Sequence, residues 1–210
     1  MQRFSTLALI VGTVFYPMMA SSQDPSFKFE ITPFAAYRFG GTLEQKDGPG
    51  RFDVENSDAQ GIILDIAARI GGHWEILYMR QDTRVGTSGV LPSIASLELD
   101  IEHLQFGGSY SFEGESTQPF LSLTLGISRL EPNPLGSGAE IYPSVSIGGG
   151  FRFRADKRIG VRVEGRVLTT LVDNDSRILC VSSGGAACAI QIQGTPLTQW
   201  EARAGLVFRF

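Results

Sequence analysis

The chain has 210 residues, of which 42% are hydrophobic and 19% are charged, and this composition excludes a disordered or collagen-like chain. The formal net charge is −4, with 22 acidic against 18 basic residues, which gives no reason to expect nucleic acid as a partner. Beyond the first 22 residues no stretch is long and apolar enough for a transmembrane helix. The length suits one generous domain or two small ones.

The first residues have the pattern of a secretory signal peptide. Arg3 supplies a positive charge, residues 7–19 form an apolar run, and small residues end at Ser22. A short membrane anchor is the alternative, but the small residues after the run favour cleavage. We predict a signal peptide over residues 1–22, one domain over residues 23–210, and export from the cytoplasm.

Beyond residue 26 the dominant pattern is an alternation of apolar and polar residues, which is typical of half-buried β-strands. In residues 27–39, for example, Phe29 and Ile31 alternate with Glu30 and Thr32. The same period recurs at residues 62–69, 74–81, 97–112, 121–128, 144–154, 161–167 and 200–210. The pattern therefore predicts eight strands, with no convincing amphipathic helix between them.

Two of these strands carry an irregularity. In residues 97–112 the apolar positions change parity, and a bulge near Glu102 and His103 would bring them to one face. Pro33 falls in the middle of the first strand, where it has no backbone N–H to donate. We expect a bulge or irregular pairing at that point.

The connections between the strands alternate in length. Tight turns are expected at residues 70–73, 113–117 and 155–158, and long loops at residues 41–60, 84–96, 130–140 and 172–196. This alternation predicts an all-β fold, an eight-stranded antiparallel up-and-down transmembrane β-barrel with short periplasmic turns and long extracellular loops. An even number of strands places both termini at the periplasmic end.

Alternation alone does not say which face lines the interior, because a soluble barrel such as a lipocalin has its apolar face inside. Three features favour the inverted arrangement: arginine-rich charge on the polar face, aromatic residues near strand ends, and a chain that stops on a strand at Phe210. The charges assigned to this interior face are Lys28, Arg38, Arg69, Arg152, Arg154, Arg162, Arg166, Arg203 and Arg209 with Glu30, Asp65, Glu75, Glu98, Asp100, Glu102, Glu164 and Glu201.

Three segments carry a family resemblance: residues 31–41, 103–110 and 200–210. They resemble the small eight-stranded outer-membrane barrels of Gram-negative bacteria, the group that contains the OmpA transmembrane domain, OmpX and OmpW. The resemblance implies a location in the outer membrane, in contact with its lipids and lipopolysaccharide. It also implies that the last strand, through Leu206, Phe208 and Phe210, is the signal read by the barrel-assembly machinery.

The cysteines and histidines are the candidates for a disulfide, a metal site or a catalytic site. Cys180 and Cys188 are the only cysteines, and in an exported chain they most simply form a disulfide, since a metal or redox site would need more ligands. Some barrels of the group modify lipid A with a histidine, but His73 falls in a predicted turn and His103 has no matching serine motif. We predict no catalytic, cofactor-binding or metal-binding residue.

Alternating charges on the polar face predict a charge network in the barrel lumen. Its expected members are Glu30, Asp65, Arg69, Arg162, Glu164, Arg166, Glu201 and Arg203. Because side chains just fill the interior of an eight-stranded barrel, a static salt-bridge plug is the favoured interpretation. A gate that rearranges to pass small ions is the alternative.

The long loops carry whatever recognition the protein has. Residues 41–60 lean acidic, and residues 84–96 are unusually apolar, including Val85, Val90 and Leu91. Such an apolar patch binds a partner, dips into lipopolysaccharide or packs within its own loop. We predict a non-enzymatic outer-membrane protein with a structural or surface-interaction role and no cofactor. A narrow gated pore for small solutes and a lipid-modifying enzyme are the alternatives.

Overall fold

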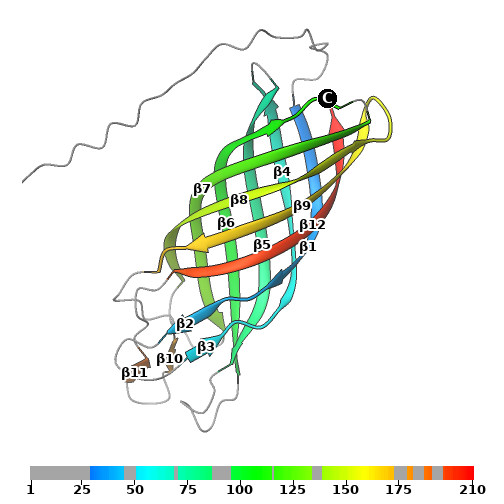
Figure 1. Ribbon diagram of the computed structural model, residues 1–210. Coiled ribbons are helices and arrows are strands. Elements are labelled where there is room, and N and C mark those ends of the chain that lie inside the picture. The colour runs from blue at the N-terminus through cyan, green and yellow to red at the C-terminus, as the bar shows by residue number, and fades with distance from the viewer. Residues whose placement is uncertain are drawn as a thin grey trace, which may run out of the picture.

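Eight antiparallel strands close into a barrel in the order β1-β12-β9-β8-β7-β6-β5-β4 (Figure 1). The computed structural model describes residues 29–44, 51–68, 71–86, 96–114, 116–133, 139–172, 179–181, 187–190 and 196–210. The barrel strands are β1 (Phe29–Phe39), β4 (Ser57–Ala67), β5 (Gly72–Gly86), β6 (Ser96–Ser111), β7 (Thr117–Asn133), β8 (Glu140–Arg154), β9 (Ile159–Thr170) and β12 (Leu197–Arg209). The predicted eight-stranded antiparallel barrel is confirmed.

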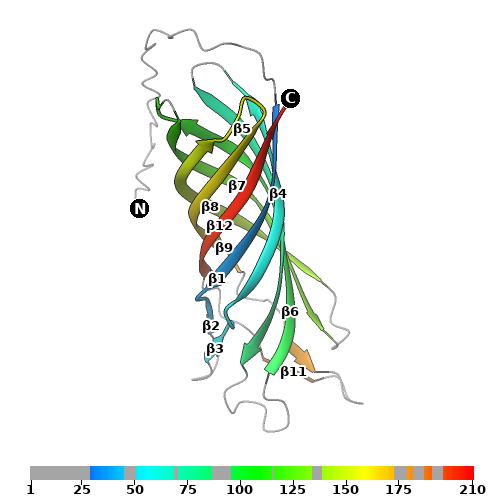
Figure 2. The ribbon, with the colours of Figure 1, turned by 90° about the vertical axis from the view of Figure 1, so that its right-hand side faces the viewer.

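The two ends of the barrel differ. At one end, which we call the short-turn end, the backbone N–H of Phe210 donates to the carbonyl of Phe29 at 3.0 Å, so the last strand closes on the first. The opposite, long-loop end carries two small two-stranded sheets (Figures 1 and 2). They are β2 (Thr42–Glu44) with β3 (Arg51–Asp53), and β10 (Leu179–Val181) with β11 (Ala187–Ile190). The segment 41–60, expected to be a loop, thus contains a hairpin and the start of β4.

The period of two decides which side chains face out. On β7, Leu121, Leu123 and Leu125 face outward and are 55–61% exposed, whereas Ser122 and Thr124 between them are buried in the interior. On the other barrel strands, too, the exposed large side chains are apolar, whereas the interior holds buried charged and polar side chains together with two apolar clusters. This arrangement is the one expected for a barrel surrounded by lipid.

β6 is continuous, and the prediction of a bulge near Glu102 and His103 is wrong. Its register to β5 and β7 runs without a shift through both residues. The apolar residues change parity because the surroundings of the strand change along its length. Towards the long-loop end, Leu99 and Ile101 face inward and are fully buried, whereas Leu104 faces outward and is 52% exposed.

The register also corrects three charges that the sequence assigned to the interior. Glu98, Asp100 and Glu102 face outward, because they alternate with the inward apolar residues of β6. They form ion pairs with outward arginines of β5 and β7, such as Arg129 Nη1 to Glu102 Oε2 at 2.9 Å and Arg80 Nη2 to Asp100 Oδ2 at 3.3 Å. We call this group the outer charge belt; its members are Arg80, Asp82, Arg84, Glu98, Asp100, Glu102, Arg129 and Glu131.

Pro33 interrupts one ladder without a bulge. The pairs Ile31–Phe208 and Phe34–Gly205 of β1 and β12 have the same register on either side of it, so no residue is inserted. No pair joins the two strands at Pro33 itself, in agreement with its missing N–H. The expected irregular pairing is therefore confirmed, and the alternative of a bulge is not.

An apolar cluster fills the interior at the long-loop end. The β2–β3 hairpin contributes Leu43 and Phe52 to it, and a bridge between Val54 and Val85 fastens the hairpin to β5. Val85, predicted to lie in an apolar loop, is instead on β5 and is fully buried here. We call this group the mouth cluster; its members are Leu43, Phe52, Val54, Val85, Leu97, Leu99, Ile101, Leu130, Tyr142, Val172 and Leu197.

Candidate functional site

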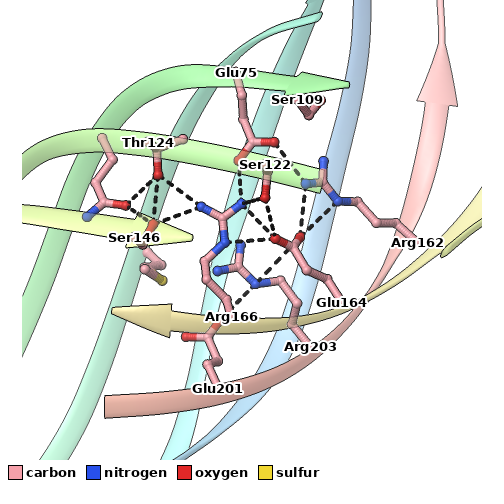
Figure 3. A network of polar contacts seen from close by, with 12 residues as sticks. Glu75, Ser109, Ser122, Thr124, Ser146, Arg162, Glu164, Arg166, Glu201 and Arg203 are labelled. Atoms are coloured by element: carbon pink, nitrogen blue, oxygen red, sulfur yellow. Dashed lines mark hydrogen bonds and ion pairs between the residues drawn. The ribbon is translucent and has the colours of Figure 1, made fainter. Parts of the chain in front are cut away.

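A ring of two arginines and two glutamates lies at the centre of the barrel interior (Figure 3). Arg162 donates from Nη2 to Glu75 Oε2 at 2.8 Å and from Nε to Glu164 Oε2 at 3.0 Å. Arg166 donates from Nη2 to Glu75 Oε1 at 2.6 Å and from Nε to Glu164 Oε1 at 2.8 Å. Glu75 lies on β5 and the other three on β9, which stand on opposite walls in the strand order. The ring therefore crosses the lumen.

Short neutral side chains complete the hydrogen bonding of Arg166. Its Nη1 donates to the hydroxyls of Thr124 and Ser146 at 3.0 Å each, and its Nη2 donates to Ser122 at 2.9 Å. Thr124 and Ser146 in turn donate to Gln105 Oε1 at 2.8 and 2.7 Å. Because β7 and β8 present small residues here, the long arginines of β9 have room to extend across the barrel.

Gly148 on β8 also leaves room for the charged side chains of β9. A Cβ at this position would lie 2.3 Å from Glu164 Oε1 and 3.0 Å from the Ser122 hydroxyl. Any other residue would therefore displace the carboxylate that holds Arg162 and Arg166 together.

A second group of ion pairs continues from the ring towards the short-turn end. Asp65 Oδ2 on β4 accepts from Arg162 Nη1 at 3.1 Å and from Arg152 Nη2 at 3.2 Å. At the rim, Arg209 Nε donates to Glu30 Oε1 at 2.7 Å. Asp65 thus links the central ring to the charged residues near the short-turn end.

Arg38 lies between the ring and the mouth cluster and makes several polar contacts there. Its Nε donates to Glu201 Oε2 at 2.7 Å, its Nη1 to Gln81 Oε1 at 2.9 Å, and its Nη2 to the Met79 sulfur at 2.7 Å. Nη1 also lies 3.0 Å from His103 Nε2. Every nitrogen of this fully buried guanidinium therefore has a partner.

The contact with Arg38 settles the tautomer of His103. An arginine only donates, so His103 Nε2 is the acceptor and the ring proton is on Nδ1. Nδ1 then donates to Ser128 Oγ at 2.6 Å, and Ser128 lies 3.0 Å from the Thr170 hydroxyl. This buried histidine is neutral and acts as a link in the network.

Arg203 on β12 is the exception in this network. It is 3% exposed, and its Nε lies 2.7 Å from Glu201 Oε1 and 4.0 Å from Glu164 Oε2, within ion-pair range. Neither contact has hydrogen-bond geometry, and none of its three nitrogens has a hydrogen-bond partner. The ring of Phe34 lies 4.5 Å from its guanidinium carbon.

Most of the charge network expected from the sequence comes together in the lumen. Glu30, Asp65, Arg162, Glu164, Arg166, Glu201 and Arg203 all take part, and Arg69 lies outside the described residues. The network further includes Arg38, Glu75, Arg152 and Arg209, which share the same polar face in the sequence. The neutral partners His103, Gln105, Ser122, Thr124 and Ser146 were missed, although their alternation with outward apolar residues is a usable signal.

Comparison with known proteins gives structural relatives only. No protein-family model and no curated protein matches the chain. Neisserial surface protein A (NspA) is similar, with a TM-score of 0.59 and 12% identity over 87% of this chain and 97% of that one. OprG, an outer-membrane protein of Pseudomonas aeruginosa, is similar with a TM-score of 0.54 and 10% identity over 88% of this chain and 96% of that one. The chain has the fold of the small outer-membrane β-barrels.

The remaining residues singled out from the sequence lie at the two ends of this outer-membrane barrel fold. Cys180 is on β10 and Cys188 is on β11, the two strands of one small antiparallel sheet. At the other end, Leu206 and Phe210 face outward, and the ring of Phe210 stacks on Phe29 at a centroid distance of 5.2 Å.

The described part of the chain lacks two further features. It contains no helix long and apolar enough to cross a membrane. It also contains no group of three or more histidine, cysteine, aspartate or glutamate side chains placed to hold a metal ion.

Proposed function

We propose that the chain is a non-enzymatic protein of the outer membrane, a closed barrel that anchors its long-loop end at the cell surface for interaction with extracellular partners. The observation that carries the proposal is the filled interior. The ion pairs around Arg162 and Arg166 span the lumen, and the mouth cluster packs above them. A barrel closed in two layers is suited to holding loops in place and not to passing solutes.

The outer surface supports insertion in a lipid bilayer. Aromatic rings meet in pairs on the outside, including Trp74 with Phe106 at 5.5 Å and Phe29 with Phe210 at 5.2 Å. Beyond the apolar band the outward residues of β5, β6 and β7 become the outer charge belt, as expected where strands leave the hydrocarbon. We infer that residues 1–22 are a cleaved signal peptide, that the short-turn end with both termini is periplasmic, and that lipopolysaccharide surrounds the opposite half.

The last strand supports a role in assembly. Leu206 and Phe208 of β12, and Phe210 directly after it, alternate with the buried Val207 and Arg209, so the barrel interior does not depend on them for packing. We infer that they are read by the barrel-assembly machinery, with Phe210 also packing on Phe29 at the membrane boundary.

Conductance tests the closed barrel directly. Protein refolded into planar lipid bilayers should produce no stepwise current, because the ring spans the lumen and no charged member of it is free to move without leaving a partner unpaired. A known small porin in the same lipid is the control for insertion. Reproducible single-channel steps from the wild-type protein would overturn the proposal in favour of a narrow pore.

The geometry argues against a lipid-modifying enzyme. Ser128 and His103 lie 2.6 Å apart, at the distance of a nucleophile and its base. However, both are buried inside the barrel, His103 also accepts from Arg38, and Ser128 contacts Thr170. A lipid outside the wall cannot reach them. His73, the other histidine, lies near the short-turn end, far along the strands from the loops.

We further propose that Cys180 and Cys188 form a disulfide. The register of β10 and β11 places Cys180 opposite the segment that contains Cys188. Protein from the outer membrane should therefore show no alkylation of either thiol until a reductant is added. Cys180→Ser should leave barrel assembly intact, because the small sheet lies outside the hydrogen-bonded wall. Quantitative alkylation without reductant would contradict the disulfide.

A further inference from the structure

Between the mouth cluster and the short-turn end, the barrel interior holds one more positive than negative charge. Among the described residues, its six arginines are Arg38, Arg152, Arg162, Arg166, Arg203 and Arg209, and its five carboxylates are Glu30, Asp65, Glu75, Glu164 and Glu201. The excess does not come from the rim, because Glu30 and Arg209 there pair with each other. His103 does not add to the excess, since its contact with Arg38 requires a neutral ring.

The excess is localised at Arg203. Both oxygens of Glu164, the residue opposite it on β9, accept from Arg162 and Arg166. Glu201 Oε2 accepts from Arg38, and its Oε1 lies near Arg203 without making a hydrogen bond. Arg203 therefore shares each carboxylate within ion-pair range, Glu201 at 2.7 Å and Glu164 at 4.0 Å, with another guanidinium group, and neither carboxylate gives it a hydrogen bond.

The surroundings of Arg203 make a charge that is only partly compensated costly. On one side lies the ring of Phe34, which belongs to a buried apolar cluster. That cluster consists of Phe34, Ala36, Ala59, Ile63, Leu77, Met79 and Leu168. A charge in such a position needs a counter-charge, because hydrogen-bonding groups alone do not offset the loss of hydration.

We propose that Arg203 binds a small monovalent inorganic anion, of the chloride class, inside the barrel. One negative charge balances the excess, and the N–H groups on the three guanidinium nitrogens, which lack acceptors, would hold it. A larger or doubly charged anion does not suit an interior that side chains fill, where only one charge is in excess. The anion is a structural ligand of the lumen and not a permeating ion.

Anomalous diffraction tests the site in the wild-type protein. Crystals grown in sodium chloride and transferred to sodium bromide should show a bromide peak within hydrogen-bonding distance of Arg203. No peak is expected at Arg38, which is equally buried but has a partner for every nitrogen. Bromide on the protein surface with none at Arg203 would overturn the proposal.

Unfolding in urea provides a second test that requires no crystal. At constant ionic strength, replacing gluconate by chloride should raise the folded-to-unfolded ratio about tenfold for each tenfold rise in chloride above its dissociation constant. Arg203→Gln should remove this dependence, and Arg203→Lys should keep it because the positive charge remains. A chloride dependence that is unchanged in Arg203→Gln would overturn the assignment, and if neither variant folds, the bromide measurement decides.

Discussion

Glu164→Gln is expected to destabilise the barrel by about 3–5 kcal/mol, the usual cost of removing one partner from a buried ion pair. Glu164 accepts from Arg162, Arg166 and Ser122, and it is fully buried. The neutral amide cannot accept from both arginines with the same strength, so two guanidinium groups lose a counter-charge in a site closed to water. Urea unfolding in lipid vesicles, followed by tryptophan fluorescence, measures the change.

Glu98→Gln is the matched control. Glu98 also lies in a strand and pairs with an arginine, but its side chain is 64% exposed and Arg84 is 3.8 Å away. Exposed pairs of this kind contribute less than about 1 kcal/mol, so this variant should unfold close to wild type.

The conductance of Glu164→Gln separates the plug from the gate. If the ring is a static plug, the mutant is less stable and still passes no current, because the mouth cluster closes the lumen above it. If Arg162 and Arg166 form a gate, the mutant keeps its stability and acquires ion currents. A stable, conducting mutant would reject the closed barrel proposed above.

Leu123→Arg is expected to cost about 2–4 kcal/mol in refolding titrations, the range measured for arginine at the bilayer midplane on a barrel exterior. Leu123 lies near the middle of β7, faces outward and is 55% exposed, so an arginine there would meet hydrocarbon. Leu123→Ala controls for the loss of side-chain size.

A second arginine variant tests the dependence on depth. Thr198 faces outward on β12 near the long-loop end, beyond Trp200, where the cost should fall to about 0–1 kcal/mol. Equal penalties for Leu123→Arg and Thr198→Arg would contradict the assignment of Leu123 to the middle of the bilayer.

The two layers that close the lumen differ in what they require of the chain. The central ring depends on arginine, because each guanidinium reaches two carboxylates at once, which the compact ammonium of lysine does in poorer geometry. The mouth cluster instead uses the hydrophobic effect, which needs no partner at a fixed angle. If the barrel is closed as proposed above, the mouth cluster should keep the lumen closed when one ion pair is lost.

The strands and their facing could be predicted from the sequence because each follows from local alternation. Glu30, Asp65, Glu164 and Arg166 occupy polar positions in alternating segments, and such positions point to one face whatever the rest of the chain does. That the apolar face points outward could also be predicted, since arginine on the polar face and aromatic residues at the strand ends distinguish a lipid-exposed barrel from a soluble one.

The sequence misled where the surroundings of a strand change along its length. Leu99 and Leu104 are both apolar, one because it packs in the mouth cluster and the other because it faces outward in the apolar band. Local alternation contains no information about which of two apolar environments a residue meets, so a bulge seemed necessary. Val85 is a similar case, because only the β2–β3 hairpin folding over it removes it from water.

By itself, the sequence determined the eight strands, their order and their polar interior, because these depend on neighbours two residues apart and on turn length. Only the tertiary structure decided which charges meet. Glu75 reaches Arg162 and Arg166 across the lumen from the opposite wall, over separations of 87 and 91 residues. The same closure leaves Arg203 without a hydrogen-bond acceptor. Both outcomes depend on barrel closure and register, which bring side chains from four or more strands to one point, and no local pattern in the sequence encodes that meeting.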